Sequence, residues 1–175
     1  INGSYLLNEI FAATLLIYLI NLLGPVNPVT WLIFSIAMIL YVQALMDLKT
    51  LLLSQPLSFL LIVIGLVANL GFEIFAVPLD SLLGLIFGYG LLFSINMLYK
   101  ILRSLDGIGS GDFLLLSGIG SILGASAIGP ILLLGSSLTI SIYVISKDPK
   151  IKELPLGFGL GLGGILYLLM LMTLR

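Results

Sequence analysis

A run of apolar residues, LLGLIFGYGLLFSINML from residue 82 to residue 98, contains no charged side chain. A helix needs about 20 such residues to cross the roughly 30 Å hydrocarbon core of a bilayer. The whole chain has the same character, because 60% of its 175 residues are hydrophobic, 9% are charged and the mean hydropathy is +1.28. These values lie outside the range of soluble domains and predict an integral membrane protein.

Similar apolar runs occur on both sides of this one, separated by charged or Pro/Gly-rich breaks. We therefore predict an all-α fold, a bundle of about seven transmembrane helices, and treat residues 1–175 as a single polytopic membrane domain. The fifth run is short and glycine-rich, which leaves open six spans with a re-entrant fifth segment. The predicted spans are residues 10–23, 29–45, 57–75, 82–98, 113–128, 131–145 and 154–174.

Proline and glycine mark the expected breaks between spans. Gly24, Pro25 and Pro28 predict one tight connection, Pro56 opens the third span, and Gly129 with Pro130 separate the fifth from the sixth. Small residues also recur four positions apart, a spacing that suits close helix packing in membranes. These pairs are Gly84 with Gly88, Gly120 with Gly124, and Gly157 with Gly161.

The positive charges predict the orientation of the bundle. If seven spans alternate, six of the seven Lys and Arg residues fall on one face, and the positive-inside rule makes that face cytoplasmic. The N-terminus then lies inside. The six are Lys49, Lys100, Arg103, Lys147, Lys150 and Lys152, and only Arg175 falls on the other face.

The residue types that are absent restrict the chemistry. Without cysteine or histidine, the chain has no thiol nucleophile, no imidazole base and none of the usual transition-metal ligand sets, so we expect neither a metal nor a cofactor. The net charge of −1 and the absence of a basic stretch exclude nucleic acid as a partner. The lipid bilayer is the partner that the composition requires. Acid–base chemistry must come from carboxylates, lysines or tyrosines.

Most of the eight acidic residues have an ordinary explanation. Glu9 begins the first span, where negative charge favours a helix N-terminus. Five others are predicted to be solvated loop charges: Glu73, Asp80, Asp106, Asp148 and Glu153.

Asp47 and Asp112 remain, each flanked by apolar residues at the end of a predicted span, and the predicted topology puts both at the cytoplasmic face. An acid near hydrocarbon is a functional candidate by default. Structural alternatives are a helix cap for Asp112 and pairing with Lys49 or interfacial hydration for Asp47.

The glycines beside Asp112 favour a functional role. Gly109 and Gly111 leave room for a backbone to approach the carboxylate, and we expect them to permit positive φ in this loop. Two neighbouring carboxylates share one proton and activate water, with one acting as base and the other as proton donor. Asp47 and Asp112 are therefore a candidate catalytic pair, with Gly109, Gly111 and Lys49 as candidate supporting residues, and the structural alternatives remain open.

The sequence resembles the type IV prepilin peptidase family of GxGD-type membrane aspartic peptidases. The resemblance lies in residues 84–100 and 107–116, in Met46-Asp47-Leu48-Lys49 and in Leu154-Pro155-Leu156-Gly157. Even Tyr5-Leu6-Leu7-Asn8-Glu9 is similar to the segment that follows the zinc-binding loop in bacterial members.

The resemblance implies an aspartic endopeptidase of the prokaryotic inner membrane that removes leaders from prepilin or pseudopilin precursors of type IV pilus or type II secretion systems, at the cytoplasmic face. It implies Asp47 and Asp112 as the catalytic residues. The expected precursors have a short basic leader and a hydrophobic N-terminal helix.

The chain departs from the family pattern at three positions. Ser54 and Gln55 precede Pro56 where an Ile-Pro-Asp or Leu-Pro-Asp turn is usual, and Phe158 takes the place of the second proline in a Pro-Phe-Gly-Pro motif. No segment resembles the N-terminal methyltransferase part or its four cysteines. We therefore expect either a fragment or a peptidase-only form.

Other functional classes remain open. The presenilin and signal-peptide-peptidase group shares Gly-x-Gly-Asp but expects Tyr-Asp and Pro-Ala-Leu motifs, whereas this chain has Met46-Asp47 and no Pro-Ala-Leu. A proton- or cation-coupled transporter subunit would use membrane acids differently, and a non-catalytic membrane assembly protein of the same fold would keep both aspartates without turnover. The physiological substrate and the oligomeric state are not predicted.

Overall fold

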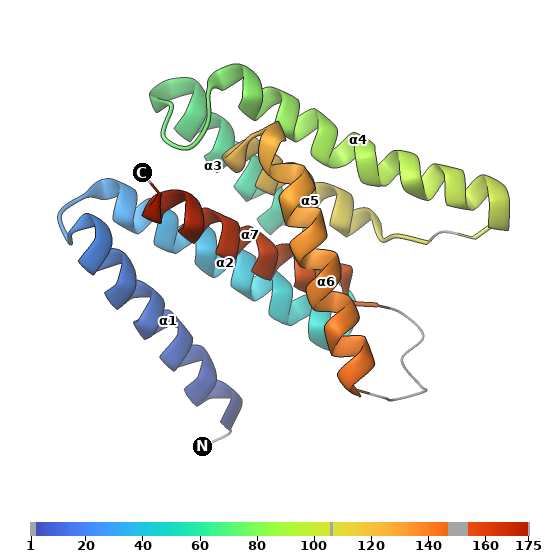
Figure 1. Ribbon diagram of the computed structural model, residues 1–175, viewed down its shortest axis with the longest axis horizontal. Coiled ribbons are helices and arrows are strands. Elements are labelled where there is room, and N and C mark those ends of the chain that lie inside the picture. The colour runs from blue at the N-terminus through green and yellow to red at the C-terminus, as the bar shows by residue number, and fades with distance from the viewer. Residues whose placement is uncertain (1–2, 106, 147–153, 175) are drawn as a thin grey trace.

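The computed structural model describes residues 3–105, 107–146 and 154–174. Within these residues the secondary structure is entirely helical (Figure 1). Five of the helices are long and apolar enough to cross a membrane, and two further apolar helices are shorter. The predicted all-α membrane bundle is confirmed. The elements are α1 (Gly3–Leu23), α2 (Pro28–Thr50), α3 (Gln55–Phe72), α4 (Pro78–Arg103), α5 (Ser110–Leu123), the 3₁₀ turn η1 (Ala125–Ala127), α6 (Ile128–Ser146) and α7 (Leu156–Thr173).

Proline lies at the beginning of three of these helices, of which the sequence predicted only the one at Pro56. Pro28 and Pro78 are the first residues of α2 and α4, and Pro56 is the second residue of α3. The fixed φ of proline suits these positions, where a missing N–H costs no intrahelical hydrogen bond. The Asn27 side chain accepts a hydrogen bond from Val29 N at 3.0 Å and caps α2.

The break between the fifth and sixth spans lies earlier than the sequence prediction. The predicted separation at Gly129 and Pro130 is wrong, because both residues belong to the first turn of α6. The fifth helix instead ends before Gly124, whose φ of 87° is a conformation that glycine adopts without strain. Proline is tolerated in a first helical turn, so Pro130 does not terminate the helix.

Helix α5 lies at the centre of the bundle and packs against α3, α4 and α7 (Figure 1). It is one unbroken helix of 14 residues that does not turn back on itself, and almost all of its side chains are buried. Gly84 and Gly88 of α4 face it, and a Cβ on either would collide with the backbone of α5. These glycines therefore serve close helix packing, as their spacing predicts.

Candidate active site

Asp47 lies in the last turn of α2, close to the start of α7. Its side chain is only 5% exposed. One carboxylate oxygen, Oδ2, accepts a hydrogen bond of 2.8 Å from the peptide N–H of Phe158, the third residue of α7. The residue before α7 is Pro155, which offers no side-chain cap. Asp47 thus caps α7 from another helix, which is the contact expected between a carboxylate and a helix N-terminus.

Asp112 is the third residue of α5, and its surroundings are different. The side chain is 9% exposed, and its Oδ1 atom has no hydrogen-bond partner among the described residues. The N-cap of α5 is Gly109 rather than Asp112. A buried carboxylate oxygen without a partner is uncommon and calls for an explanation other than packing.

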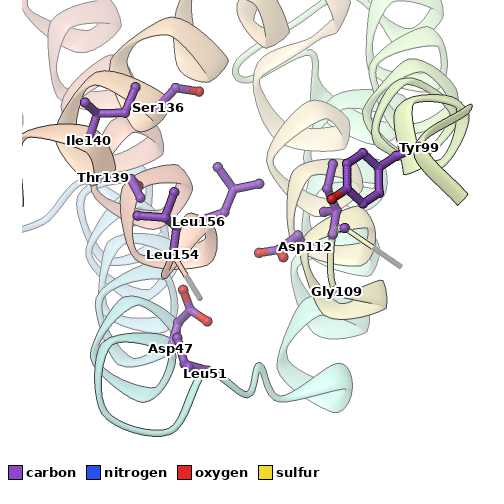
Figure 2. A pocket seen from close by; sticks show the side chains of 12 residues that line it. Asp47, Leu51, Tyr99, Gly109, Asp112, Ser136, Thr139, Ile140, Leu154 and Leu156 are labelled. Carbon is purple, nitrogen blue, oxygen red and sulfur yellow. The ribbon is translucent and has the colours of Figure 1, made fainter. Parts of the chain in front are cut away.

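The two aspartates come together at one cavity of about 690 Å³. In Figure 2 the side chains of Asp47 and Asp112 point into the same space from different helices. They are close enough for their charges to interact. The walls are mostly apolar, with a few polar groups. They are formed by the ends of α2 and α4, the starts of α5 and α7, and the middle of α6. The other lining residues are Leu51, Tyr99, Gly107, Ile108, Gly109, Ser136, Thr139, Ile140, Leu154 and Leu156.

The glycines beside Asp112 give the site room rather than an unusual backbone. The expected positive φ is wrong, because Gly109 has φ of −66° and Gly111 lies within α5, outside the positive-φ glycines of the described chain. A Cβ on Gly109 would lie 3.3 Å from Asp112 Oδ2, and a Cβ on Gly111 would lie 2.9 Å from Leu53 Cβ. These glycines therefore allow close packing of Leu53 and Asp112, and the predicted approach of a substrate backbone remains a prediction.

Leu53 packs between two glycines of the site, Gly111 of α5 and Gly157 of α7. Besides Gly111, it lies against Gly157, where a Cβ would be 2.8 Å from Leu53 Cδ1 and 3.0 Å from Asp112 Oδ1. Gly157 follows Leu156 at the start of α7, so this glycine lies between the carboxylate of Asp112 and the helix end capped by Asp47. Sequence reasoning noted Leu154-Pro155-Leu156-Gly157 as a motif, but did not assign Gly157 or Leu53 to the site.

The departures from the family pattern have identifiable structural roles. Ser54 N–H donates to Gln43 Oε1 at 2.8 Å, and Gln43 Nε2 donates back to Ser54 C=O at 3.1 Å. This buried glutamine therefore fixes the turn that carries Leu53. Gln55 is the first residue of α3. Phe158 supplies the N–H that binds Asp47, a bond that proline cannot make.

Lys49 does not belong to the cavity. It is exposed in the last turn of α2 and is not among the cavity-lining residues. A cation near a helix C-terminus interacts favourably with the helix dipole. The predicted support from Lys49 therefore remains a prediction without a contact to the carboxylates among the described residues.

The other acids include two corrections. The predicted role of Glu9 at a helix N-terminus is wrong, because α1 begins at Gly3 and has no acid in its first turn. Asp80 is not a solvated loop charge, because α4 begins at Pro78, four residues earlier than predicted. Asp80 accepts hydrogen bonds from Ala125 N at 3.3 Å and Ser126 Oγ at 3.4 Å. Glu9 and Glu73 are exposed, and Glu73 follows the last turn of α3. The predictions for Asp106, Asp148, Glu153, Lys147, Lys150, Lys152 and Arg175 lie outside the described residues.

No group of three or more acidic side chains that would suit a metal ion occurs in the part of the chain that the structure describes. The chemistry available to the cavity from this chain is that of two carboxylates, the phenol of Tyr99, and the hydroxyls of Ser136 and Thr139.

Comparison with known proteins identifies the family. Residues 32–145 match the model of the type IV leader peptidase family. A prepilin leader peptidase/N-methyltransferase of Aeromonas salmonicida is 33% identical over 183 aligned residues, which cover 97% of this chain and 59% of the relative.

A protein of the same name from Burkholderia pseudomallei is 30% identical, over 91% of this chain and 52% of the relative. Another, from Pseudomonas aeruginosa, is 39% identical over 57% of this chain and 33% of the relative. The chain thus spans less than two thirds of the length of these relatives. No solved structure is significantly similar.

Proposed function

The chain belongs to the type IV leader peptidase family, and from this we propose that it is a membrane-embedded aspartic endopeptidase. Its substrates are prepilin-like or pseudopilin precursors, whose leader it removes. Asp47 and Asp112 are the proposed catalytic pair. The observation that carries the proposal is the meeting of two buried carboxylates from distant parts of the chain at one cavity, with one carboxylate oxygen lacking a partner.

The proposed reaction needs only these two side chains and water. One carboxylate accepts a proton from a water molecule while the water oxygen bonds to the carbonyl carbon of the scissile peptide. The other carboxyl group gives its proton to the carbonyl oxygen, which produces a neutral gem-diol. Protonation of the peptide nitrogen and cleavage of the C–N bond then release the two products, and the pair again holds one proton.

The walls of the cavity support a precursor with an apolar segment. Leu51, Ile108, Ile140, Leu154 and Leu156 surround the carboxylates with apolar side chains. Ligand sites commonly combine such walls with a few polar groups that orient the bound molecule. The hydroxyl groups that line the cavity belong to Tyr99, Ser136 and Thr139, and that of Thr139 donates to Pro155 C=O at 3.3 Å.

Positive charge supports a cytoplasmic active site. Lys49, Lys100 and Arg103 are exposed and lie at the same end of the bundle as Asp47 and Tyr99. By the positive-inside rule this end faces the cytoplasm. The proposed localisation is therefore an inner membrane with cleavage at its cytoplasmic face.

The proposal is tested by incubating the purified chain in lipid vesicles with a prepilin-like precursor and measuring leader loss on a gel. We expect cleavage by the parent chain and none by Asp47→Asn or Asp112→Asn. Glu73→Gln, an exposed acid at the other end of α3, is the control and should cleave normally. Full cleavage by both aspartate variants would overturn the assignment of Asp47 and Asp112 as the catalytic pair. Absence of cleavage by the parent chain would favour a non-catalytic assembly protein of the same fold.

A further inference from the structure

The two carboxylates of the cavity have unlike surroundings. Asp47 Oδ2 accepts the 2.8 Å hydrogen bond from Phe158 N–H at the beginning of α7. Asp112 Oδ1 is buried without a partner, and it lies close to Gly157, where a side chain would touch it. The segment of Gly157 and Phe158 therefore donates a hydrogen bond to Asp47, and it lies beside Asp112 Oδ1 without donating to that atom.

This difference favours opposite protonation states. A hydrogen bond from an N–H and the positive end of a helix dipole both favour an ionised carboxylate. Burial of an oxygen without a donor disfavours charge, and two interacting carboxylates disfavour double ionisation. The proton that the pair shares therefore has a preferred position on Asp112.

We propose that the peptide N–H of Phe158 is a positioning donor that keeps Asp47 ionised as the general base, which leaves Asp112 as the protonated member that donates to the substrate carbonyl. The inference rests on the proposed peptidase function and assigns the two roles that the family resemblance leaves open. Asp47 takes the proton of the attacking water, the water oxygen bonds to the carbonyl carbon, and the proton of Asp112 passes to the carbonyl oxygen.

Few other charges act on Asp47 within the described residues. Helices α3 and α7 contain no Asp, Glu, Lys or Arg, and α1 carries only Glu9, which is exposed. Asp112 is the acid of α5 that shares the cavity, Tyr99 of α4 lines it, and Lys49 is exposed two positions after Asp47. The backbone N–H groups of Gly157 and Phe158 both act on Asp47, and Phe158 makes the 2.8 Å bond. Asp112 has only the backbone N–H of Gly109, and its Oδ1 keeps no partner among the described residues.

The contribution of this N–H can be isolated because it lies in a first helical turn. Phe158 is the third residue of α7, where the N–H makes no intrahelical bond and proline is tolerated. Phe158→Pro removes the N–H together with the ring, whereas Phe158→Ala removes the ring alone. A third variant, with phenyllactic acid incorporated at position 158, replaces the N–H by an ester oxygen and retains the ring.

The experiment measures the pH dependence of kcat for precursor cleavage in the parent chain and these variants. We expect the acid limb to move up by about one pH unit in Phe158→Pro and in the ester variant, the size expected for one lost charge-assisted hydrogen bond. In the plateau above the limb, kcat should recover, and KM should change little. Phe158→Ala should keep the parent acid limb, whatever its rate.

Equal acid limbs in the ester variant and the parent chain would overturn the inference, as would a shift in Phe158→Ala as large as that in Phe158→Pro. The ester variant decides the outcome if the proline variant does not fold. Failure of the proposed function gives different results, namely no cleavage by the parent chain, or cleavage that persists in both Asp47→Asn and Asp112→Asn.

Discussion

The two ends of α5 bury polar side chains in opposite ways. At its C-terminal end, Asn69 of α3 is fully buried and makes four hydrogen bonds, donating to Ser121 C=O and Ile122 C=O and accepting from Phe75 N–H and Ala76 N–H at 2.8 to 3.1 Å. At its N-terminal end, Asp112 is buried with Oδ1 unpartnered beside a cavity.

The difference separates a structural polar group from a functional one. Asn69 uses its whole hydrogen-bonding capacity to hold the loop between α3 and α4 against α5, so its burial stabilises the fold. Asp112 Oδ1 has no hydrogen bond that would offset the free-energy cost of its burial. Such a group destabilises the fold, which fits a side chain that binds substrate or water. Substitutions at the two ends should therefore affect stability and activity in opposite proportions.

The largest expected effect is the loss of cleavage in Asp112→Asn. The rate should fall by about 10³-fold or more, because general acid–base catalysis contributes on that order. Thermal stability in detergent should change little, since the substitution replaces one buried neutral polar side chain by another of the same size. A double variant with Asp47→Asn should be hardly worse than either single variant, because cooperating catalytic groups are strongly non-additive.

Asn69→Ala should show the opposite behaviour. It removes four hydrogen bonds to buried or partly buried peptide groups, although Ser121 C=O keeps its bond from Ser81 Oγ. We therefore expect a loss of about 3 kcal/mol in the free energy of unfolding. The protein that remains folded at low temperature should cleave at nearly the parent rate. Asn27→Ala, which removes the cap of α2, is a milder control of about 1 kcal/mol. A large fall in kcat for folded Asn69→Ala would break the comparison between the two ends.

The sequence predicted the helices and the pair of aspartates, but not the loop that Asn69 holds after α3. Hydropathy located every helix, because burial in lipid demands a continuous apolar run. The pair Asp47 and Asp112 was also predictable, since few other acids lacked a local explanation. The third predicted span extended to Phe75, whereas α3 ends at Phe72. Phe75 is apolar and buried like a residue of a span, but its N–H donates to the Asn69 side chain instead of a helix carbonyl.

The part of the site that the sequence missed depends on contacts between distant segments. The bond from Phe158 to Asp47 joins residues 111 positions apart, and nothing local in either segment requires it. Leu53 is an ordinary apolar residue in the sequence, and only the packing of Gly111 and Gly157 against it gives it a role. Such contacts arise from the assembly of α2, α5 and α7, which residue periodicity does not encode.

Two glycines of α4, Gly88 and Gly90, test how closely this helix packs against α5. A Cβ on Gly88 would lie 2.6 Å from the carbonyl oxygen of Leu116, whereas no atom lies within 4 Å of a Cβ added to Gly90. Gly88→Ala should therefore lower the free energy of unfolding by about 2 kcal/mol through overpacking against a backbone that does not yield. Gly90→Ala should be neutral or slightly stabilising. Both effects are measured by thermal denaturation in the same detergent, and equal stabilities would contradict the close packing of α4 on α5.

The smallest effect should come from Gly157→Ala, which tests whether space beside Asp112 is needed for activity. The added Cβ meets two flexible side chains, those of Leu53 and Asp112, so a small displacement relieves the contact and the fold should persist. The same displacement moves Oδ1 of Asp112, and we expect kcat to fall about tenfold, since about 1 Å of misplacement in a catalytic group costs up to 10²-fold. Combining it with Leu53→Ala should restore part of that rate, because the contact with Leu53 disappears while the contact with Asp112 remains.

Gly71→Ala is the control for Gly157→Ala, as nothing lies within 4 Å of its added Cβ. Strictly additive effects of Gly157→Ala and Leu53→Ala on kcat would show that the two residues do not share this contact, and the unpartnered oxygen would then need another explanation.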